Sequence, residues 1–197
     1  MQLTVVRHGQ TAANQARRFP SSAAVALDGA GWQQACRAGQ AIAELPDRPQ
    51  SIHSSDSRRA LDTADLIERY LRPSTVISHP ELREIDWGTL ADGHPSTRPD
   101  INPALAAWQR DPTQRLPGGE SLLDVDVRVS RFLDRLAASG DDSVVVVSHA
   151  VTIGVLVAQL NGWDLLDTWH SHRAHLRNGE LLCLDLAPIT ASSSRSF

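Results

Sequence analysis

The chain has 197 residues and a formal charge of −4, with 19 basic residues against 23 acidic ones. All of the basic residues are arginines, and lysine is absent. This composition excludes a Schiff-base lysine and the lysine of P-loop and kinase-type nucleotide sites. Any bound anion must therefore be held by arginine, histidine or backbone amides.

Hydrophobic residues make up 41% of the chain, which fits one compact domain. No stretch forms a basic patch, so we expect no nucleic-acid partner. Cys36 and Cys183 have neither CxxC nor zinc spacing, which favours a reducing compartment. The run Val151–Leu160 is too short and too interrupted to cross a bilayer, and the N-terminus shows no signal-peptide pattern. We therefore expect a cytoplasmic protein with no membrane partner.

Strand and helix patterns alternate along the chain. The predicted elements are, in chain order, a buried strand at Leu3–Val6, a helix from Gly29 to about Ala43, a weak strand at Ser51–His53, a helix from about Ser57 to Tyr70, a short strand at Val76–Ser78, a short helix at Pro103–Arg110, a long amphipathic helix after Gly119, a buried strand at Val144–Val147, an apolar helix at Ala150–Leu160 and a closing strand at Leu181–Leu186. The segment Pro80–Asn102 is expected to be irregular, and Thr190–Phe197 to be a loose tail.

These patterns predict an α/β fold: a three-layer α/β/α sandwich around a mostly parallel central sheet. The two runs of consecutive β-branched residues are typical of strands that are covered on both faces. We expect residues 1–197 to form a single domain, in which 80–118 is an insertion that covers the active site.

Polar and charged residues follow three of the predicted strands directly. Arg7-His8-Gly9 follows the first, Ser54–Arg59 follows the second, and Ser148-His149 follows the valine run. Ligands of open α/β sheets bind beyond the carboxyl ends of the strands. The sequence thus predicts a site with two histidines and at least one arginine pair at one edge of the sheet.

Arg7-His8-Gly9 can be interpreted in two ways. A neutral imidazole is a good nucleophile near neutral pH, and an adjacent arginine would hold an anionic electrophile against it. The glycine would allow a positive φ or the close approach of a ligand. A structural histidine beside a structural arginine explains the tripeptide equally well, because such short motifs match often.

Four further motifs decide between these interpretations. Together with the first, they resemble, in order, the signatures of the histidine phosphatase (phosphoglycerate mutase-like) superfamily and favour its short phosphatase branch. The five stretches are Val6–Asn14 (RHGxTxxN), Ser54–Ala64 (SSDxxRAxxTA), Leu82–Gly88 (LxExxxG), Pro117–Ser121 (PGGES) and Val144–His149 (VVVSH). The resemblance implies a phosphoglycerate mutase-like fold and phosphoryl-transfer chemistry.

The resemblance implies a role for each matching residue. His8 matches the nucleophile, which forms a phosphohistidine that water then breaks. Arg7 and Arg59 match the arginines that grip the non-bridging oxygens, and His149 matches a second histidine that would donate to phosphate when protonated. Arg58 falls on a variable position, and one step along a helix turns it by about 100°, so we expect it on the solvent face.

Glu84 matches the general acid, which would protonate the leaving oxygen and then help to deprotonate water. Glu81 and Asp86 are close competitors for this role, and all three could simply be surface charges. Gly9, Asn14 and Ala150 are further candidates for phosphate binding, the last through the start of the following helix. A loop-capping role competes for Asn14.

Two departures from the family pattern put the substrate class in doubt. Many members continue after the acid with GxWEG, whereas this chain reads Gly88–His94 without that Trp or Glu. The usual Trp before Asn14 is Ala13. Arg17 or Arg18 could contact a second anionic group of a substrate, although solvated charges explain them as well.

The cluster His170, His172 and His175 invites a metal interpretation. No carboxylate or cysteine at a recognised spacing supports it, so we favour a solvent-facing or pocket-rim segment. The implied chemistry needs no metal and no other cofactor, because arginines and histidines supply the positive charge.

The sequence predicts a metal-independent phosphatase that hydrolyses small phosphomonoesters through phospho-His8. Phosphoglycerate mutase-type phosphoryl transfer and a non-catalytic phospho-ligand binding domain are the alternatives. The expected partner is a small phosphorylated metabolite. The oligomeric state stays open, with a homodimer as the assembly to test.

Overall fold

The computed structural model describes residues 1–19, 23–71, 75–91 and 102–186. Its centre is a five-stranded sheet in the order β3-β2-β4-β1-β5. All neighbouring strands are parallel except β1 and β5. The strands are β1 (Gln2–Arg7), β2 (Ser51–Ser55), β3 (Thr75–His79), β4 (Ser143–Ser148) and β5 (Leu181–Asp185). The predicted α/β fold with a mostly parallel sheet is confirmed.

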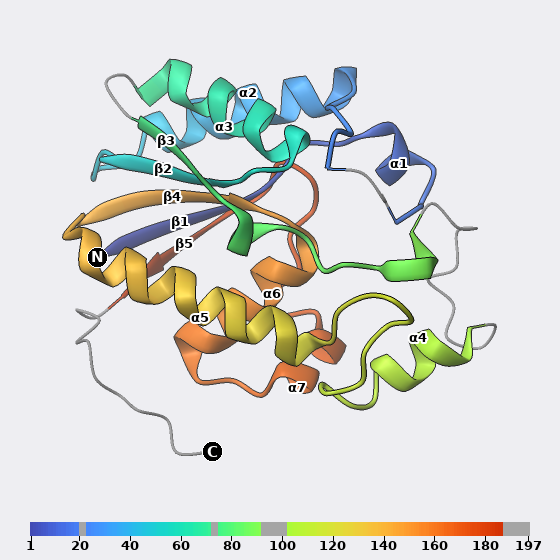
Figure 1. Cartoon of the computed structure of the whole chain (residues 1–197). Coiled ribbons are helices and arrows are strands. Elements are labelled where there is room, and N and C mark those ends of the chain that lie inside the picture. The colour runs from blue at the N-terminus through green and yellow to red at the C-terminus, as the bar shows by residue number, and fades with distance from the viewer. Residues whose placement is uncertain (20–22, 72–74, 92–101, 187–197) are drawn as a thin grey trace.

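Helices cover both faces of this sheet (Figure 1). One layer contains α2 (Gly29–Ala43) and α3 (Arg58–Leu71), and the other contains α5 (Leu122–Ser139), α6 (Ala150–Asn161) and α7 (Leu165–Ser171). The short helices α1 (Ala12–Gln15) and α4 (Pro103–Trp108) lie beyond the carboxyl ends of the parallel strands (Figure 1). Two single 3₁₀ turns, η1 (Pro80–Leu82) and η2 (Gly88–Leu90), flank the segment that carries Glu84.

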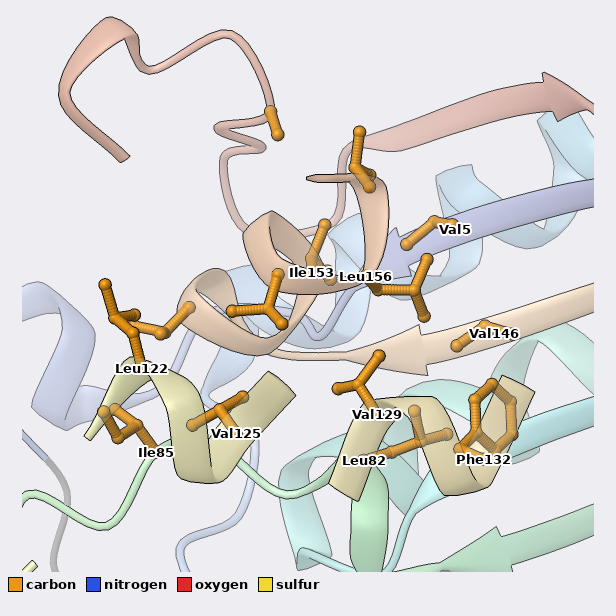
Figure 2. Close-up of a cluster of buried hydrophobic side chains, with 14 of the residues drawn as sticks. Val5, Leu82, Ile85, Leu122, Val125, Val129, Phe132, Val146, Ile153 and Leu156 are labelled. Carbon is orange, nitrogen blue, oxygen red and sulfur yellow. The ribbon is translucent and has the colours of Figure 1, made fainter. Parts of the chain in front are cut away.

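The larger part of the core lies between the sheet and the layer of α5 and α6. Figure 2 shows side chains of both helices converging on Val5 of β1 and Val146 of β4, with Leu82 of η1 beside them. Each fully buried aliphatic side chain of this kind contributes roughly 1.5–3 kcal/mol to the stability. This packing fixes β1 and β4, which carry the two histidine motifs at their ends.

Two helices differ from the sequence-based expectation. The spacing of apolar residues did not predict α1 or α7, because the first is a single turn and the second contains one buried residue, Thr168. Each begins with a local side-chain cap, from Thr11 and Asp164 respectively. Such caps satisfy the free N–H groups of a helix start without the need for an apolar face.

Parts of two expectations lie outside the described residues. The tail 190–197 is one, and residues 92–101 of the proposed insertion are another. The covering role of 80–118 therefore stays a prediction, although the described part of this segment brings Glu84 and Trp87 to the carboxyl edge of the sheet. In the part of the chain that the structure describes, no helix is long and apolar enough to cross a membrane.

Candidate active site

The carboxyl ends of β1 and β4 bring the two predicted histidines together. The strands are adjacent and parallel, with Arg7 opposite Ser148, so the residues that follow them are neighbours. The ring centroids of His8 and His149 are 5.0 Å apart. Both side chains are almost completely buried, at 3% and 0% exposure.

The hydrogen bonds of His8 determine its tautomer. Its Nδ1 lies 2.6 Å from the carbonyl oxygen of Gly9. A carbonyl can only accept, so Nδ1 carries the proton and donates it. In the neutral ring Nε2 then keeps its lone pair, which is the requirement for a nucleophile.

The surroundings of His8 favour this neutral form. Burial, Arg59 and Arg7 lower its pKa well below the usual 6.5, although the hydrogen bond to Gly9 opposes the shift. Desolvation disfavours the charged ring, and two nearby positive charges repel it. His8 therefore stays unprotonated over the whole neutral range.

The side chain of Arg7 is held by the segment that precedes β5. Its Nη1 donates to the carbonyl oxygen of Leu176 at 2.8 Å. Its Nε is buried and has no hydrogen-bond partner among the described residues. Burial lowers the pKa of Arg7 from its usual 12.5, an effect that Glu84 and Glu180 oppose, and the guanidinium remains charged at neutral pH. Arg7 also lines the cavity described below.

Arg58 and Arg59 have opposite environments at the start of α3. Arg59 is 3% exposed, and its charge acts on both His8 and His149. Arg58 points to solvent and pairs with Asp62 one turn later, at 2.6 Å. The structure therefore places Arg59 at the histidine pair and Arg58 away from it.

His149 is the N-cap residue of α6 and contacts β2. Ser55 Oγ donates to Ser57 Oγ, so it accepts from His149 Nε2 at 2.9 Å. The Nδ1 atom of His149 is buried without a hydrogen-bond partner among the described residues. Burial, Arg59 and His8 lower the pKa of His149 well below 6.5. The protonated form expected from the sequence is thus disfavoured by these surroundings, and the negative charge of a bound phosphate would favour it.

Glu84 lies against the first turn of α6. Its Oε1 accepts from the backbone N–H groups of Val151 at 3.1 Å and Thr152 at 3.3 Å. The carboxylate also acts on the pKa of Arg7 and of Arg59, which places it beside the same cluster. The helix start predicted to bind phosphate near Ala150 is therefore used in part by Glu84.

The two competitors of Glu84 face elsewhere. Glu81 pairs with Arg135 of α5 at 2.6 Å. Asp86 is exposed and accepts from the backbone N–H of Gly88 at 2.9 Å. Of the three acidic side chains in this segment, Glu84 is the one that lines the cavity described below.

Gly9 does not have the positive φ that was one of its two predicted roles. A Cβ atom built on it would lie 2.4 Å from the carbonyl oxygen of Gly31 in α2. At Gly9 two backbone segments thus approach each other closely, which only glycine permits. The backbone N–H of Gly9 also donates a hydrogen bond to Thr63 Oγ1, at 3.1 Å.

The oxygen of Asn14 has the capping role that the sequence left open. Oδ1 accepts from the backbone N–H and the hydroxyl of Thr11 at 3.2 and 3.1 Å. It also accepts from Asn178 Nδ2, at 3.2 Å. Asn14 lines the cavity, and any contact with phosphate would have to come from its Nδ2.

A cavity of about 310 Å³ opens beside these residues. Arg7, Asn14 and Glu84 line its polar side. Its other described lining residues are Arg17, Arg18, Phe19, Trp87, Ala150, Val151, Trp169, His175 and Asn178. Arg17, Arg18 and His175 thus reach the cavity, whereas His170 and His172 are not among its lining.

Asn178 and the aromatic lining residues were missed by the sequence analysis. Asn178 donates to the carbonyl oxygen of His8 at 3.0 Å and so ties the loop that carries His8 to the segment before β5. In the sequence, Asn178-Gly179 indicates only a turn. Phe19, Trp87 and Trp169 come from three distant segments, and no local pattern connects them.

The histidine cluster shows no metal-binding geometry. His172 and His175 are in edge-to-face contact, with centroids 6.0 Å apart. Among the described residues, no group of three or more His, Cys, Asp or Glu side chains is arranged to hold a metal ion.

The chain is similar to proteins of known family over almost its whole length. The model of the histidine phosphatase superfamily (branch 1) matches residues 3–191. A probable phosphoglycerate mutase GpmB of Proteus mirabilis is 32% identical over 193 residues, which cover 94% of this chain and 85% of the relative. A glucosyl-3-phosphoglycerate phosphatase of Mycolicibacterium vanbaalenii is 34% identical over 179 residues, covering 85% and 76%.

Solved structures agree with this similarity. A mycobacterial glucosyl-3-phosphoglycerate phosphatase in complex with VO3 superposes with a TM-score of 0.80 at 30% identity. The superposition covers 93% of this chain and 90% of that one. The similarity in sequence therefore extends to the whole fold.

Proposed function

Because the chain belongs to the histidine phosphatase superfamily, we propose that it is a metal-independent phosphatase that hydrolyses small phosphomonoesters through a phosphohistidine at His8. The observation that carries this proposal is the hydrogen bond from His8 Nδ1 to the Gly9 carbonyl, which leaves a lone pair on Nε2. The lowered pKa keeps that lone pair available, and the charges of Arg7 and Arg59 lie beside it.

In the first step, Nε2 of His8 attacks phosphorus, and the bond from phosphorus to the ester oxygen breaks. Arg7, Arg59 and His149 stabilise the charge on the three non-bridging oxygens. Glu84 gives a proton to the leaving oxygen, so the alcohol departs neutral and Glu84 becomes a carboxylate. The amides of Val151 and Thr152 hold that carboxylate in place.

In the second step, a water molecule attacks phosphorus and the N–P bond breaks. Glu84 takes a proton from the water, which restores its acid form. Inorganic phosphate leaves, and His8 returns to its neutral state with Nε2 unprotonated. Each group thus ends the cycle as it began, without a metal or cofactor.

A mutase that transfers the phosphoryl group between hydroxyls is the second candidate. The similarity to a probable phosphoglycerate mutase and the presence of Arg17, Arg18 and His175 at the cavity favour it. These cationic or ionisable groups could retain a second anionic group. Assays with 3-phosphoglycerate distinguish the two, because a mutase converts it to an isomer whereas a phosphatase releases phosphate.

Turnover of an aryl phosphate in the presence of EDTA tests the mechanism. We expect the wild type to release phosphate, and a rapid acid-free quench to trap a labelled phosphohistidine that the His8→Ala variant lacks. The matched control is His170→Ala, which removes an exposed histidine of α7 and should leave the activity unchanged. Activity that survives in His8→Ala would sink the mechanism, and an inactive wild type that binds phosphate would favour a non-catalytic binding domain.

A further inference from the structure

One side of the cavity beside Glu84 is built of aromatic rings. Phe19 lies flat on Trp87, with centroids 3.8 Å apart and planes 13° from parallel. Trp169 of α7 lines the same cavity. We call Phe19, Trp87 and Trp169 the aromatic wall.

The aromatic wall is fixed by the core beneath it. Trp108 of α4 is completely buried and contacts both tryptophans of the wall, at centroid distances of 6.0 Å to Trp87 and 5.1 Å to Trp169. Trp87 is itself only 6% exposed. Phe19 and Trp169 are half-buried and offer the wall's open surface. A surface so supported is pre-formed, which lowers the entropy cost of binding.

The position of the wall shows which part of a substrate would meet it. Trp87 follows Glu84 by three residues in the same segment. The wall and the acid line one cavity, whereas Arg7 marks its phosphate side. In the proposed reaction Glu84 protonates the leaving oxygen, so the leaving alcohol begins at Glu84 and extends over the rings.

We propose that the aromatic wall is the leaving-group subsite and that it selects phosphomonoesters whose alcohol carries an extended apolar chain or ring. The inference rests on the proposed function and adds the substrate class to it. The rings give mainly apolar contact, because each indole has a single N–H donor and no acceptor for the several hydroxyls of a sugar. Arg17, Arg18 and His175 also line the cavity, so a polar leaving group is the competing outcome.

A series of straight-chain alkyl phosphates tests the subsite. Ethyl, butyl, hexyl and octyl phosphate have leaving alcohols of nearly equal acidity, so differences in rate report on binding of the chain. We expect kcat/KM to rise roughly two- to fourfold for each methylene until the cavity is filled. Glycerol phosphate and 3-phosphoglycerate should be poorer substrates than hexyl phosphate.

Variants of the aromatic wall test whether these rings cause the dependence of kcat/KM on chain length. Phe19→Ala and Trp169→Ala should each lower the ratio of hexyl to ethyl phosphate in kcat/KM severalfold. The ratio within one variant cancels general losses of active protein. Trp32→Ala is the matched control, because Trp32 is 44% exposed on α2 and lies outside the cavity lining; it should keep both the ratio and the activity.

Calorimetric binding of hexylphosphonate and methylphosphonate gives a readout that needs no turnover. Tighter binding of hexylphosphonate, lost in Trp169→Ala, supports the subsite even if hydrolysis fails. A flat chain-length series with active enzyme, or a preference for glycerol phosphate, overturns the subsite and leaves the phosphatase intact. Equal affinity for the two phosphonates in a protein that hydrolyses nothing overturns both.

Discussion

Neighbouring arginines in this protein have different roles because a helix turns by about 100° at each residue. Arg59 faces the histidine pair and is buried, whereas Arg58 is solvated and paired with Asp62. A buried guanidinium near developing negative charge stabilises it strongly, since little solvent screens the interaction. An exposed ion pair does not act on the reaction in this way.

The two arginines therefore provide a matched pair of variants. We expect Arg59→Ala to lower kcat/KM for an aryl phosphate by roughly 100- to 1,000-fold, which is typical for removal of one transition-state donor. Arg58→Ala should stay within about twofold of the wild type, because the removed charge is solvated. Steady-state kinetics of both variants check this. Equal losses would mean that the helix start acts as a unit and that the assignment of Arg59 is wrong.

At the scale of elements, a clamp fixes the segment that carries Glu84. Arg128 of α5 donates to both carboxylate oxygens of Glu120, at 3.1 and 3.2 Å, and to the carbonyl oxygen of Glu81. Glu120 in turn accepts from the backbone N–H of Asp86, at 2.9 Å. The segment Pro117–Ser121, which the sequence shows only as a motif, thus holds the segment of Glu84 against α5.

Close backbone packing requires one glycine in that motif, Gly119, and one in the segment that carries Glu84, Gly88. A Cβ atom on Gly119 would lie 2.2 Å from the carbonyl oxygen of Asp86. Gly88 has φ +53° and would meet the carbonyl oxygen of Pro117 at the same distance. Only glycine fits where two backbones approach so closely. The residues of the clamp and the two glycines hold the segment of Glu84 and are not among the described residues that line the cavity.

Two arginines of α5 test the clamp. We expect Arg128→Ala to slow the hydrolysis of alkyl phosphates more than that of aryl phosphates, because poor leaving groups depend most on a well-placed acid. Glu84→Gln should show the same pattern more strongly. Arg135→Ala is the control, since Arg135 is exposed and its pair with Glu81 lies away from the site. Equal slowing of both substrate types in Arg128→Ala would indicate a merely structural role.

At the scale of the whole molecule, buried neutral histidines link stability to pH. In β2, His53 contacts Ser51 through Nε2 at 3.0 Å and His79 through Nδ1 at 2.9 Å. Ser51 Oγ donates to Asp141, so His53 Nε2 must donate to Ser51, and Nδ1 accepts from His79. Protonation of His53 would remove that acceptor. Burial and His79 lower its pKa from 6.5 to about 4.

Acidification should lower the free energy of unfolding. The folded pKa is below the unfolded one, so the unfolded chain binds more protons as pH falls below 6.5. His53 alone should cost roughly 2 kcal/mol of stability between pH 7 and pH 5. His8 and His149 act in the same direction. The free energy of unfolding in urea at the two pH values measures the loss.

His53→Gln should reduce the loss of stability on acidification. The comparison is between pH values within each variant, so a general destabilisation cancels. His170→Ala, which changes an exposed histidine, should keep the wild-type pH dependence. An unchanged pH dependence in His53→Gln would show that other groups control acid stability.

The fold and the histidine pair could be predicted from the sequence because both depend on patterns within short segments of the chain. Runs of β-branched residues predict β1 and β4. Because the carboxyl ends of parallel strands share one edge of the sheet, His8 and His149 are predicted to be neighbours. The antiparallel pairing of β5 with β1 and the contact of Glu84 with α6 depend on packing between distant segments. The aromatic wall joins positions 19, 87 and 169, and nothing in the local patterns relates them.

The fluorescence of the tryptophans in the aromatic wall should also change when a ligand binds in the cavity. Trp87 and Trp169 border the cavity, and both contact Trp108. A ligand that displaces water from these rings changes the polarity around them and shifts their emission. Trp32 and Trp163 are exposed and supply a constant background. Ligand binding can therefore be followed by intrinsic fluorescence, without any label.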